Sequence, residues 1–216
     1  MTKIKICGLK TLPDAIAAIE AGADLLGFNF YPKSPRYIEP VACAEITAIL
    51  REEHPAVTLV GVFVNSPAEE IRATLQTAHL HLAQLHGDES PEMVAELAPL
   101  AFKAIRLKSD ARADLEADNP ASKYAPQSAP ALLVDASVPG LYGGSGVTAD
   151  WDAAAQLAKQ IPLLLAGGLT PENIADAIAR VQPWGVDTAS GVESAPGVKD
   201  PAKMQAFVQA ARNRRQ

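Results

Sequence analysis

The sequence predicts an α/β protein of the (β/α)8 TIM barrel class, and three observations support this prediction. Eight short runs rich in Leu, Ile and Val follow one another, separated mainly by Ala- and Glu-rich stretches of helical period. The chain has 216 residues, of which 48% are hydrophobic, and this suffices for one core of that size. No linker, charge block or low-complexity segment interrupts the sequence, so we expect a single domain over residues 1–216. An open doubly wound sheet is the alternative, which eight strands disfavour.

The expected strands are short apolar runs. They lie near residues 3–7, 24–30, 57–64, 81–86, 101–107, 131–135, 162–166 and 184–188. The expected helices are richer in alanine and in charged residues. They lie near residues 12–22, 40–52, 67–78, 91–98, 150–159, 171–180 and 200–213. Residues 109–124 contain Asn119-Pro120 and few apolar side chains, so we expect a helix there to be short or irregular.

Proline and a capping residue mark several of the expected helix starts. Thr11 precedes Pro13 and Asp14, a pattern typical of an N-cap followed by a first helical turn. The pattern recurs at four later prolines, which are Pro67, Pro91, Pro171 and Pro201. We expect each of these at the first helical position, where the missing N–H breaks no helical hydrogen bond.

Charge and hydropathy exclude two classes of partner. The net charge is −6, and the only basic cluster is formed by Arg212, Arg214 and Arg215 near the C-terminus. We interpret this cluster as the solvated last turn of a helix, so nucleic acid is not an expected partner. No stretch of about 18 apolar residues occurs, so no segment is expected to span a membrane.

Cysteine usage and the N-terminus favour a cytoplasmic protein. The sequence enters a strand without the apolar region of a signal peptide. Cys7 and Cys43 stand without CxxC spacing, so neither a disulfide nor a zinc site is expected. Cys43 lies in an Ala-rich helical stretch and is interpreted as a buried core residue. No apolar stripe is evident outside the expected core, so we expect a monomer, with a homodimer as the alternative.

A barrel of this class carries its chemistry at the C-terminal ends of its strands. Cys7 ends the first expected strand, where a thiol is either a reactive group activated by a nearby cation or a small buried apolar residue. Asp135 ends the sixth, where a carboxyl group is either an acid with a raised pKa or a capping or ion-pairing residue.

Two further side chains stand at this rim. Arg36 follows the second expected strand in a loop stiffened by Pro32 and Pro35, so it is either a held guanidinium suited to a carboxylate or an ordinary surface arginine. His86 ends the fourth expected strand and either binds a ligand or fills the barrel mouth.

Glycine-rich turns follow the sixth, seventh and eighth expected strands. They are Gly143-Gly144-Ser145-Gly146, Gly167-Gly168 and Ser190-Gly191. Glycine lets backbone N–H groups approach an anion, and in barrels the loops after strands seven and eight are the usual phosphate cradle. The turns therefore favour a phosphate-bearing substrate over plain chain reversals.

Strand parity gives one contact prediction. If Cys7 points into the barrel, Lys5 and Lys3 do so too, because side chains alternate along a strand. A lysine in a barrel interior needs a partner. The eighth strand closes beside the first and supplies Asp187, so we expect a Lys5–Asp187 ion pair.

Six ordered blocks resemble the phosphoribosylanthranilate isomerase family of tryptophan biosynthesis. They are Lys5-Ile6-Cys7-Gly8; Gly27-Phe28-Asn29-Phe30 with Ser34-Pro35-Arg36-Tyr37; Gln84-Leu85-His86-Gly87; Asp135 with Gly143-Gly144-Ser145-Gly146; Leu165-Ala166-Gly167-Gly168-Leu169; and Gly185-Val186-Asp187 with Ser190-Gly191-Val192-Glu193. Each block alone is loose, but the ordered set, spanning residues 5–193, is specific. The resemblance implies a barrel enzyme that isomerises N-(5-phosphoribosyl)anthranilate and requires no metal or cofactor.

The resemblance also implies roles for individual residues. It makes Cys7 the general base, Asp135 the general acid and Arg36 the ligand of the anthranilate carboxylate. His86 and Asp187 are further candidate substrate-binding residues. The phosphate-binding candidates are Gly144, Ser145, Gly146, Gly167, Gly168, Ser190 and Gly191. The chain departs from the family where Ser145 replaces a threonine and where Val147 and Ala149 stand in place of a lysine and an aromatic residue, so any grip by that lysine is lost.

Two other classes of function remain as alternatives. A sister barrel enzyme acting on another phosphorylated sugar would need metal-binding clusters or diphosphate-binding basic residues, and a Schiff-base aldolase would need a lysine late in a strand, whereas Lys103 is early. A barrel that only binds a phosphorylated ligand would tolerate loss of Cys7 and Asp135.

Overall fold

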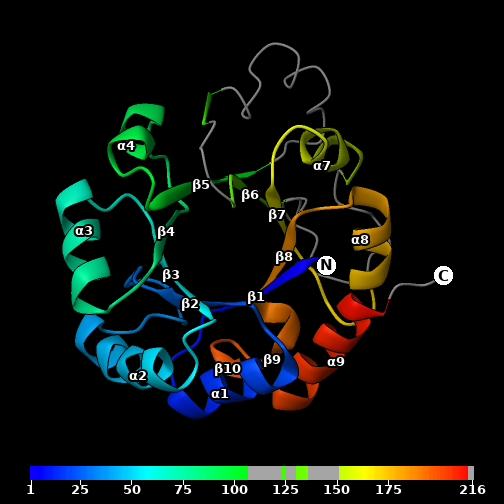
Figure 1. Cartoon of the computed structure of the whole chain (residues 1–216), viewed down its shortest axis with the longest axis horizontal. Helices are drawn as coiled ribbons and strands as arrows, with labels where there is room; N and C mark the ends of the chain where they lie inside the picture. The colour runs from blue at the N-terminus through cyan, green and yellow to red at the C-terminus, as the bar shows by residue number, and fades with distance from the viewer. Residues whose placement is uncertain (107–122, 125–129, 136–150, 214–216) are drawn as a thin grey trace.

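A computed structural model describes residues 1–106, 123–124, 130–135 and 151–213. Within them, eight parallel strands close into a barrel in chain order (Figure 1). They are β1 (Lys3–Cys7), β2 (Leu25–Asn29), β3 (Thr58–Phe63), β4 (Leu82–Leu85), β5 (Ala101–Arg106), β6 (Leu132–Asp135), β7 (Leu163–Ala166) and β8 (Gly185–Thr188). The predicted (β/α)8 TIM barrel is confirmed.

The helices form a ring outside the strands (Figure 1). Those described are α1 (Leu12–Ala21), α2 (Pro40–Glu53), α3 (Ala68–Thr77), α4 (Pro91–Glu96), α7 (Trp151–Ala158), α8 (Ile174–Val181) and α9 (Pro201–Arg212). The C-terminal helix α9 packs against α1, so the two ends of the chain complete the ring together. The helix expected within residues 109–124 lies almost wholly outside the described part.

Helix starts follow the sequence signals in part. The Thr11 side chain caps α1 by accepting from the Asp14 N–H, and Pro91 and Pro201 open α4 and α9 as predicted. The prediction is wrong for Pro67, which is the N-cap of α3. It is also wrong for Pro171, because Asn173 closes a turn by accepting from the Thr170 N–H and delays α8 until Ile174.

Strand register divides each strand between two cores. Inward-facing residues from β2 to β7 form the barrel interior, which contains Leu25, Val60, Phe102, Ala104, Leu133, Leu164 and Ala166. The alternate residues pack against the helices in the larger outer core. Because both faces are buried, the strands read as nearly continuous apolar runs. Lys5 and Gln84 interrupt the interior, with 0% and 1% of their surfaces exposed, and each therefore calls for a polar explanation.

A short segment between β8 and α9 was not predicted. It consists of a 3-10 turn, η1 (Ser190–Val192), followed by the antiparallel strands β9 (Glu193–Ala195) and β10 (Val198–Lys199). Gly197 turns this hairpin with a positive φ of 77°. A side chain at Gly197 would collide with the backbone carbonyl of Pro35, so the hairpin packs closely on the loop after β2.

The interpretation of the C-terminal arginine cluster as a solvated last turn is wrong for Arg212, and Arg214 and Arg215 lie outside the described residues. The Arg212 guanidinium donates to the Thr2 carbonyl at 2.7 Å and pairs with Asp24 at 2.7 Å. Asp24 also pairs with Lys3, whose side chain is 48% exposed at the opposite end of β1 from Cys7. Lys3 is therefore not a residue of the sealed interior, because about half of its side chain is exposed.

Candidate active site

Cys7 lies at the C-terminal end of β1 in a buried position, with 7% of its surface exposed. Gly27 of β2 stands opposite it in the strand register. A Cβ atom at Gly27 would lie 2.8 Å from the Cys7 sulfur and 3.1 Å from the Lys5 Nζ. The thiol and the ammonium therefore share the space that the absent side chain leaves open.

The predicted Lys5–Asp187 ion pair is confirmed. The Lys5 Nζ donates to Oδ1 of Asp187 at 2.7 Å, and the lysine side chain is fully buried. The two residues face each other in the β1–β8 register, so parity and barrel closure suffice to bring them together. A fully desolvated lysine is stable as a cation only beside such a carboxylate.

This pair and burial act on the Cys7 thiol in opposite directions. Burial raises the pKa of Cys7 above its ordinary value, and the Asp187 carboxylate adds to this, while Lys5 opposes it by favouring the thiolate. For Lys5, burial by itself lowers the pKa, but attraction to Asp187 and Cys7 outweighs burial and the pKa is raised. Lys5 is therefore a permanent cation beside the thiol at neutral pH.

His86 stands directly after β4, with its backbone N–H bonded to the Phe63 carbonyl. Its Nδ1 lies 2.8 Å from Nε2 of Gln84, the buried polar residue of the interior. Burial lowers the pKa of His86, against weaker upward pulls from Asp187 and Asp135. The imidazole is therefore neutral at neutral pH and suited to hydrogen bonding rather than to pairing with an anion.

Asp135 ends β6 and faces Arg106 and Ala166 in the strand register. Arg106 and His86 line a cavity of about 560 Å³ at the ends of β3, β4 and β5. Because side chains alternate along a strand, Asp135 points to the barrel interior, as Leu133 does two residues earlier. The candidate acid and the candidate base therefore both stand at the carboxyl ends of their strands.

Two of the three glycine turns adjoin. Gly167 and Gly168 follow β7 with φ values of 99° and 64°, which an L side chain rarely adopts. A Cβ at Gly168 would have no atom within 4 Å, so this backbone is open to a ligand. Gly191, after β8, sits so close to the Leu169 carbonyl that no side chain fits there. Gly144, Ser145 and Gly146 lie outside the described residues, as does Val147.

Arg36 is held by a carboxylate of the protein itself. Its Nε donates to Oε1 of Glu193 at 2.8 Å, and its Nη2 donates to Oε2 at 2.7 Å. The arginine side chain lies across Gly8, where any Cβ would collide with it. Sequence reasoning used Glu193 only as part of a motif and missed this contact, because nothing in the local pattern pairs residues that are 157 positions apart.

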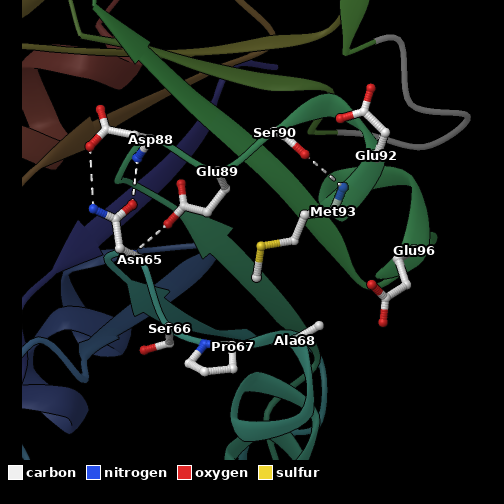
Figure 2. Close-up of a pocket in the computed structure, with 10 residues that line it drawn as sticks. All are labelled: Asn65, Ser66, Pro67, Ala68, Asp88, Glu89, Ser90, Glu92, Met93 and Glu96. Atoms are coloured by element: carbon white, nitrogen blue, oxygen red, sulfur yellow. Dashed lines mark hydrogen bonds between the residues drawn. The ribbon is translucent and has the colours of Figure 1, made fainter.

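A second groove, of about 610 Å³, lies beside the barrel mouth between the loops after β3 and β4 (Figure 2). Asn65 and Asp88 bond to each other there through side chain and backbone. Glu89 turns inward and pairs with the buried Lys103 at 3.0 Å. Lys103 also donates to the carbonyls of residues 85, 87 and 104, so it fastens the loop after β4 to β5.

No group of three or more His, Cys, Asp or Glu side chains in the described ranges is arranged to hold a metal ion. Across the same ranges, every helix is too short or too polar to cross a membrane.

The barrel mouth brings together a thiol, a buried ion pair, a carboxyl group and open glycine turns, which are the groups that an enzyme needs for acid–base chemistry on an anionic substrate. Comparison with known proteins identifies the family. The model of the N-(5′-phosphoribosyl)anthranilate (PRA) isomerase family matches residues 4–210, and the chain belongs to this family.

Relatives and solved structures agree with this assignment. The N-(5′-phosphoribosyl)anthranilate isomerase of Geotalea uraniireducens is 46% identical and that of Roseiflexus sp. is 50% identical, each comparison covering at least 98% of both chains. The crystal structure of the Thermotoga maritima enzyme superposes with a TM-score of 0.84 at 40% identity, over 98% of each chain. A further isomerase structure holds reduced 1-(o-carboxyphenylamino)-1-deoxyribulose 5-phosphate and superposes with a TM-score of 0.82 at 36% identity, again over 98% of each chain.

Proposed function

We propose that this chain isomerises N-(5′-phosphoribosyl)anthranilate to 1-(2-carboxyphenylamino)-1-deoxyribulose 5-phosphate, a step of tryptophan biosynthesis. The observation that carries the proposal is the Cys7 thiol beside the buried Lys5–Asp187 pair at the mouth of a barrel of this family. The reaction is an internal redox exchange between two sugar carbons, so it requires only proton transfers.

Asp135 is the proposed general acid. The substrate is an aminofuranose, and Asp135 protonates its ring oxygen as the bond from that oxygen to C1′ breaks. The amine nitrogen supplies the electron pair, which gives an open-chain Schiff base. The position of Asp135 at the end of β6 supports this role, because a group there reaches the barrel mouth.

Cys7 is the proposed general base. The thiolate removes the proton from C2′ of the Schiff base, the electrons move to the nitrogen, and the resulting enolamine tautomerises to the ketone. Since the pKa of Cys7 is raised, the thiolate is scarce at neutral pH but is a stronger base when it forms. Lys5 supports the base by stabilising the thiolate charge.

The binding roles are proposed on the same geometry. Arg36 takes the anthranilate carboxylate, and His86 and Asp187 contact the sugar. The adjoining turns support a phosphate cradle formed by Gly167, Gly168, Ser190 and Gly191, to which Gly144, Ser145 and Gly146 are added from the family resemblance.

A Schiff-base aldolase is disfavoured by the state of Lys103, which is buried and bonded to Glu89 and to three carbonyls. A barrel that only binds a phosphorylated ligand is the remaining alternative. A fluorescence assay of phosphoribosylanthranilate consumption separates the isomerase from the binding protein. Loss of substrate fluorescence at micromolar enzyme is expected, and an unchanged signal would favour the binding protein.

We also propose a location, a domain organisation and an oligomeric state for the enzyme. We place it in the cytoplasm as a single domain over residues 1–216, without a nucleic-acid partner, and as a monomer with a homodimer as the alternative. A second Thermotoga maritima structure is of monomers generated from the dimeric isomerase, and that chain is 35% identical to this one. Light scattering across a concentration series measures the mass directly and separates 22.7 kDa from twice that value.

A further inference from the structure

We infer that Glu193 is a positioning residue that holds Arg36 with its free N–H donors toward the substrate. Lys199 connects the Arg36–Glu193 pair to the candidate phosphate-binding loop. The inference rests on the proposed function, because it assigns Arg36 to a substrate carboxylate. It adds an ion-pair network formed by Arg36, Glu193 and Lys199, which the hairpin β9–β10 brings together.

The guanidinium of Arg36 can bind two carboxylates at once. Arginine has five N–H donors in one plane, one on Nε and two on each Nη. The Glu193 carboxylate accepts from the edge of the guanidinium that carries Nε and Nη2, with bonds of 2.8 and 2.7 Å. Two donors on Nη1 and one on Nη2 remain, and one donor of each nitrogen points out of the end of the group, away from Nε. A substrate carboxylate can therefore accept from the free donors on Nη1 and Nη2 while Glu193 stays bonded to Nε and Nη2. The Arg36–Glu193 pair thus orients Arg36 and leaves donors for the substrate.

Glu193 and Lys199 form a buried ion pair behind Arg36. The Glu193 side chain is 4% exposed and the Lys199 side chain is 1% exposed, so neither is free to rearrange. Lys199 donates to Oε1 of Glu193 at 2.8 Å. Arg36 and Lys199 therefore both pair with this one carboxylate, and together they fix its orientation.

The hairpin β9–β10 contacts both the loop that bears Arg36 and the candidate phosphate-binding loop. Lys199 also donates to the Ala189 carbonyl at 2.9 Å, immediately before the candidate phosphate-binding residues Ser190 and Gly191. The hairpin that bears Lys199 packs through Gly197 on the Pro35 carbonyl, next to Arg36. One hairpin therefore fixes the loop after β2 and the loop after β8 relative to each other.

The test uses the full chain and two ligands that each represent one end of the substrate. Dissociation constants for anthranilate and for ribose 5-phosphate are measured by NMR titration, which requires no turnover. Glu193→Gln retains an oxygen for Lys199 but places an amide against Arg36. We expect it to weaken anthranilate binding about tenfold, the usual scale for losing one charged hydrogen bond, and to leave ribose 5-phosphate binding within about twofold. For the full substrate we expect a higher KM with kcat within about twofold.

A double-variant cycle separates positioning from general damage. In an Arg36→Ala background, Glu193→Gln is expected to add nothing to the loss of anthranilate binding, because its effect acts only through Arg36. An equal added loss in both backgrounds, or equal losses for both ligands, would overturn the inference. Glu20→Gln, an exposed change on α1, is the matched control.

Lys199→Met tests whether Lys199 connects Glu193 to the loop after β8. It also keeps the inference testable if Glu193→Gln fails to fold. We expect it to weaken both ligands, since it releases both the Ala189 carbonyl and Glu193, and a loss confined to one ligand would contradict the link. If Arg36→Ala leaves anthranilate binding unchanged, the inference fails even where the wild type retains isomerase activity. If the ligand pattern holds but the wild type shows no isomerase activity, the proposed function fails instead.

Discussion

Replacing Lys5 with methionine tests how the barrel interior controls the thiol. The change keeps most of the side-chain volume and removes the Lys5 ammonium. Among the described residues, that ammonium is the only cation bonded to Asp187. Asp187, with 8% of its surface exposed, is then a carboxylate without compensation. Breaking a buried pair in this way costs about 3–5 kcal/mol of the free energy of unfolding.

The same change acts on the base. With Lys5 gone, burial and Asp187 still raise the pKa of Cys7 and the main opposing influence is lost, so the pKa rises further. The alkaline rise of kcat/KM with pH, which reports the thiolate in the free enzyme, should therefore move to higher pH. Thiolate absorbance in a parallel pH titration checks that the limb belongs to Cys7.

Stability changes and thiol changes are separated by a second variant. Lys5→Met with Asp187→Asn removes both charges, so most of the lost unfolding free energy should return while the pH limb stays displaced. Lys159→Met, an exposed change in the turn directly after α7, is the control for charge alone. A Lys5→Met enzyme whose pH limb stays at the wild-type position, or moves to lower pH, would refute the reasoning.

The remaining predictions concern three other positions. Asp135→Asn should lower kcat at least about a hundredfold with an unchanged melting temperature, and near-wild-type turnover would reject its role as the acid. Gly27→Ala should destabilise the fold by about 1–3 kcal/mol and lower kcat, because its Cβ would press on the Cys7 sulfur at 2.8 Å; urea unfolding with wild-type stability would contradict this. The pKa of Asp24 is lowered, because bonds from Lys3, the Ile4 N–H and Arg212 together outweigh the opposite effect of its burial. Asp24→Asn should therefore reduce stability at pH 7 but not at a pH well below the ordinary aspartate value, and an equal loss at both would argue against the linkage.

The parts of this molecule that sequence could predict are those governed by strand periodicity. Apolar runs locate the strands because both faces of a barrel strand are buried. Alternation then places Lys5 beside Asp187, since the closed barrel brings β1 against β8. No conformational detail beyond parity was needed for that contact.

The parts that sequence could not predict depend on short or irregular segments. β9 and β10 contain three and two residues, too few to show a period, so the hairpin that joins Arg36 to Glu193 left no pattern to read. Pro171 looked like a helix start, but the Asn173 side chain closes a turn first. Arg212 looked like a solvated charge because its partner, Asp24, is 188 positions away.

The most direct test of the central claim is the fluorescence assay of phosphoribosylanthranilate consumption with wild type and Cys7→Ala side by side. If Cys7 is the base at the barrel mouth, the wild type consumes substrate and Cys7→Ala loses at least about a hundredfold in kcat, with an unchanged melting curve. Turnover by the alanine variant at the wild-type rate would show that another group removes the proton, and would contradict the account.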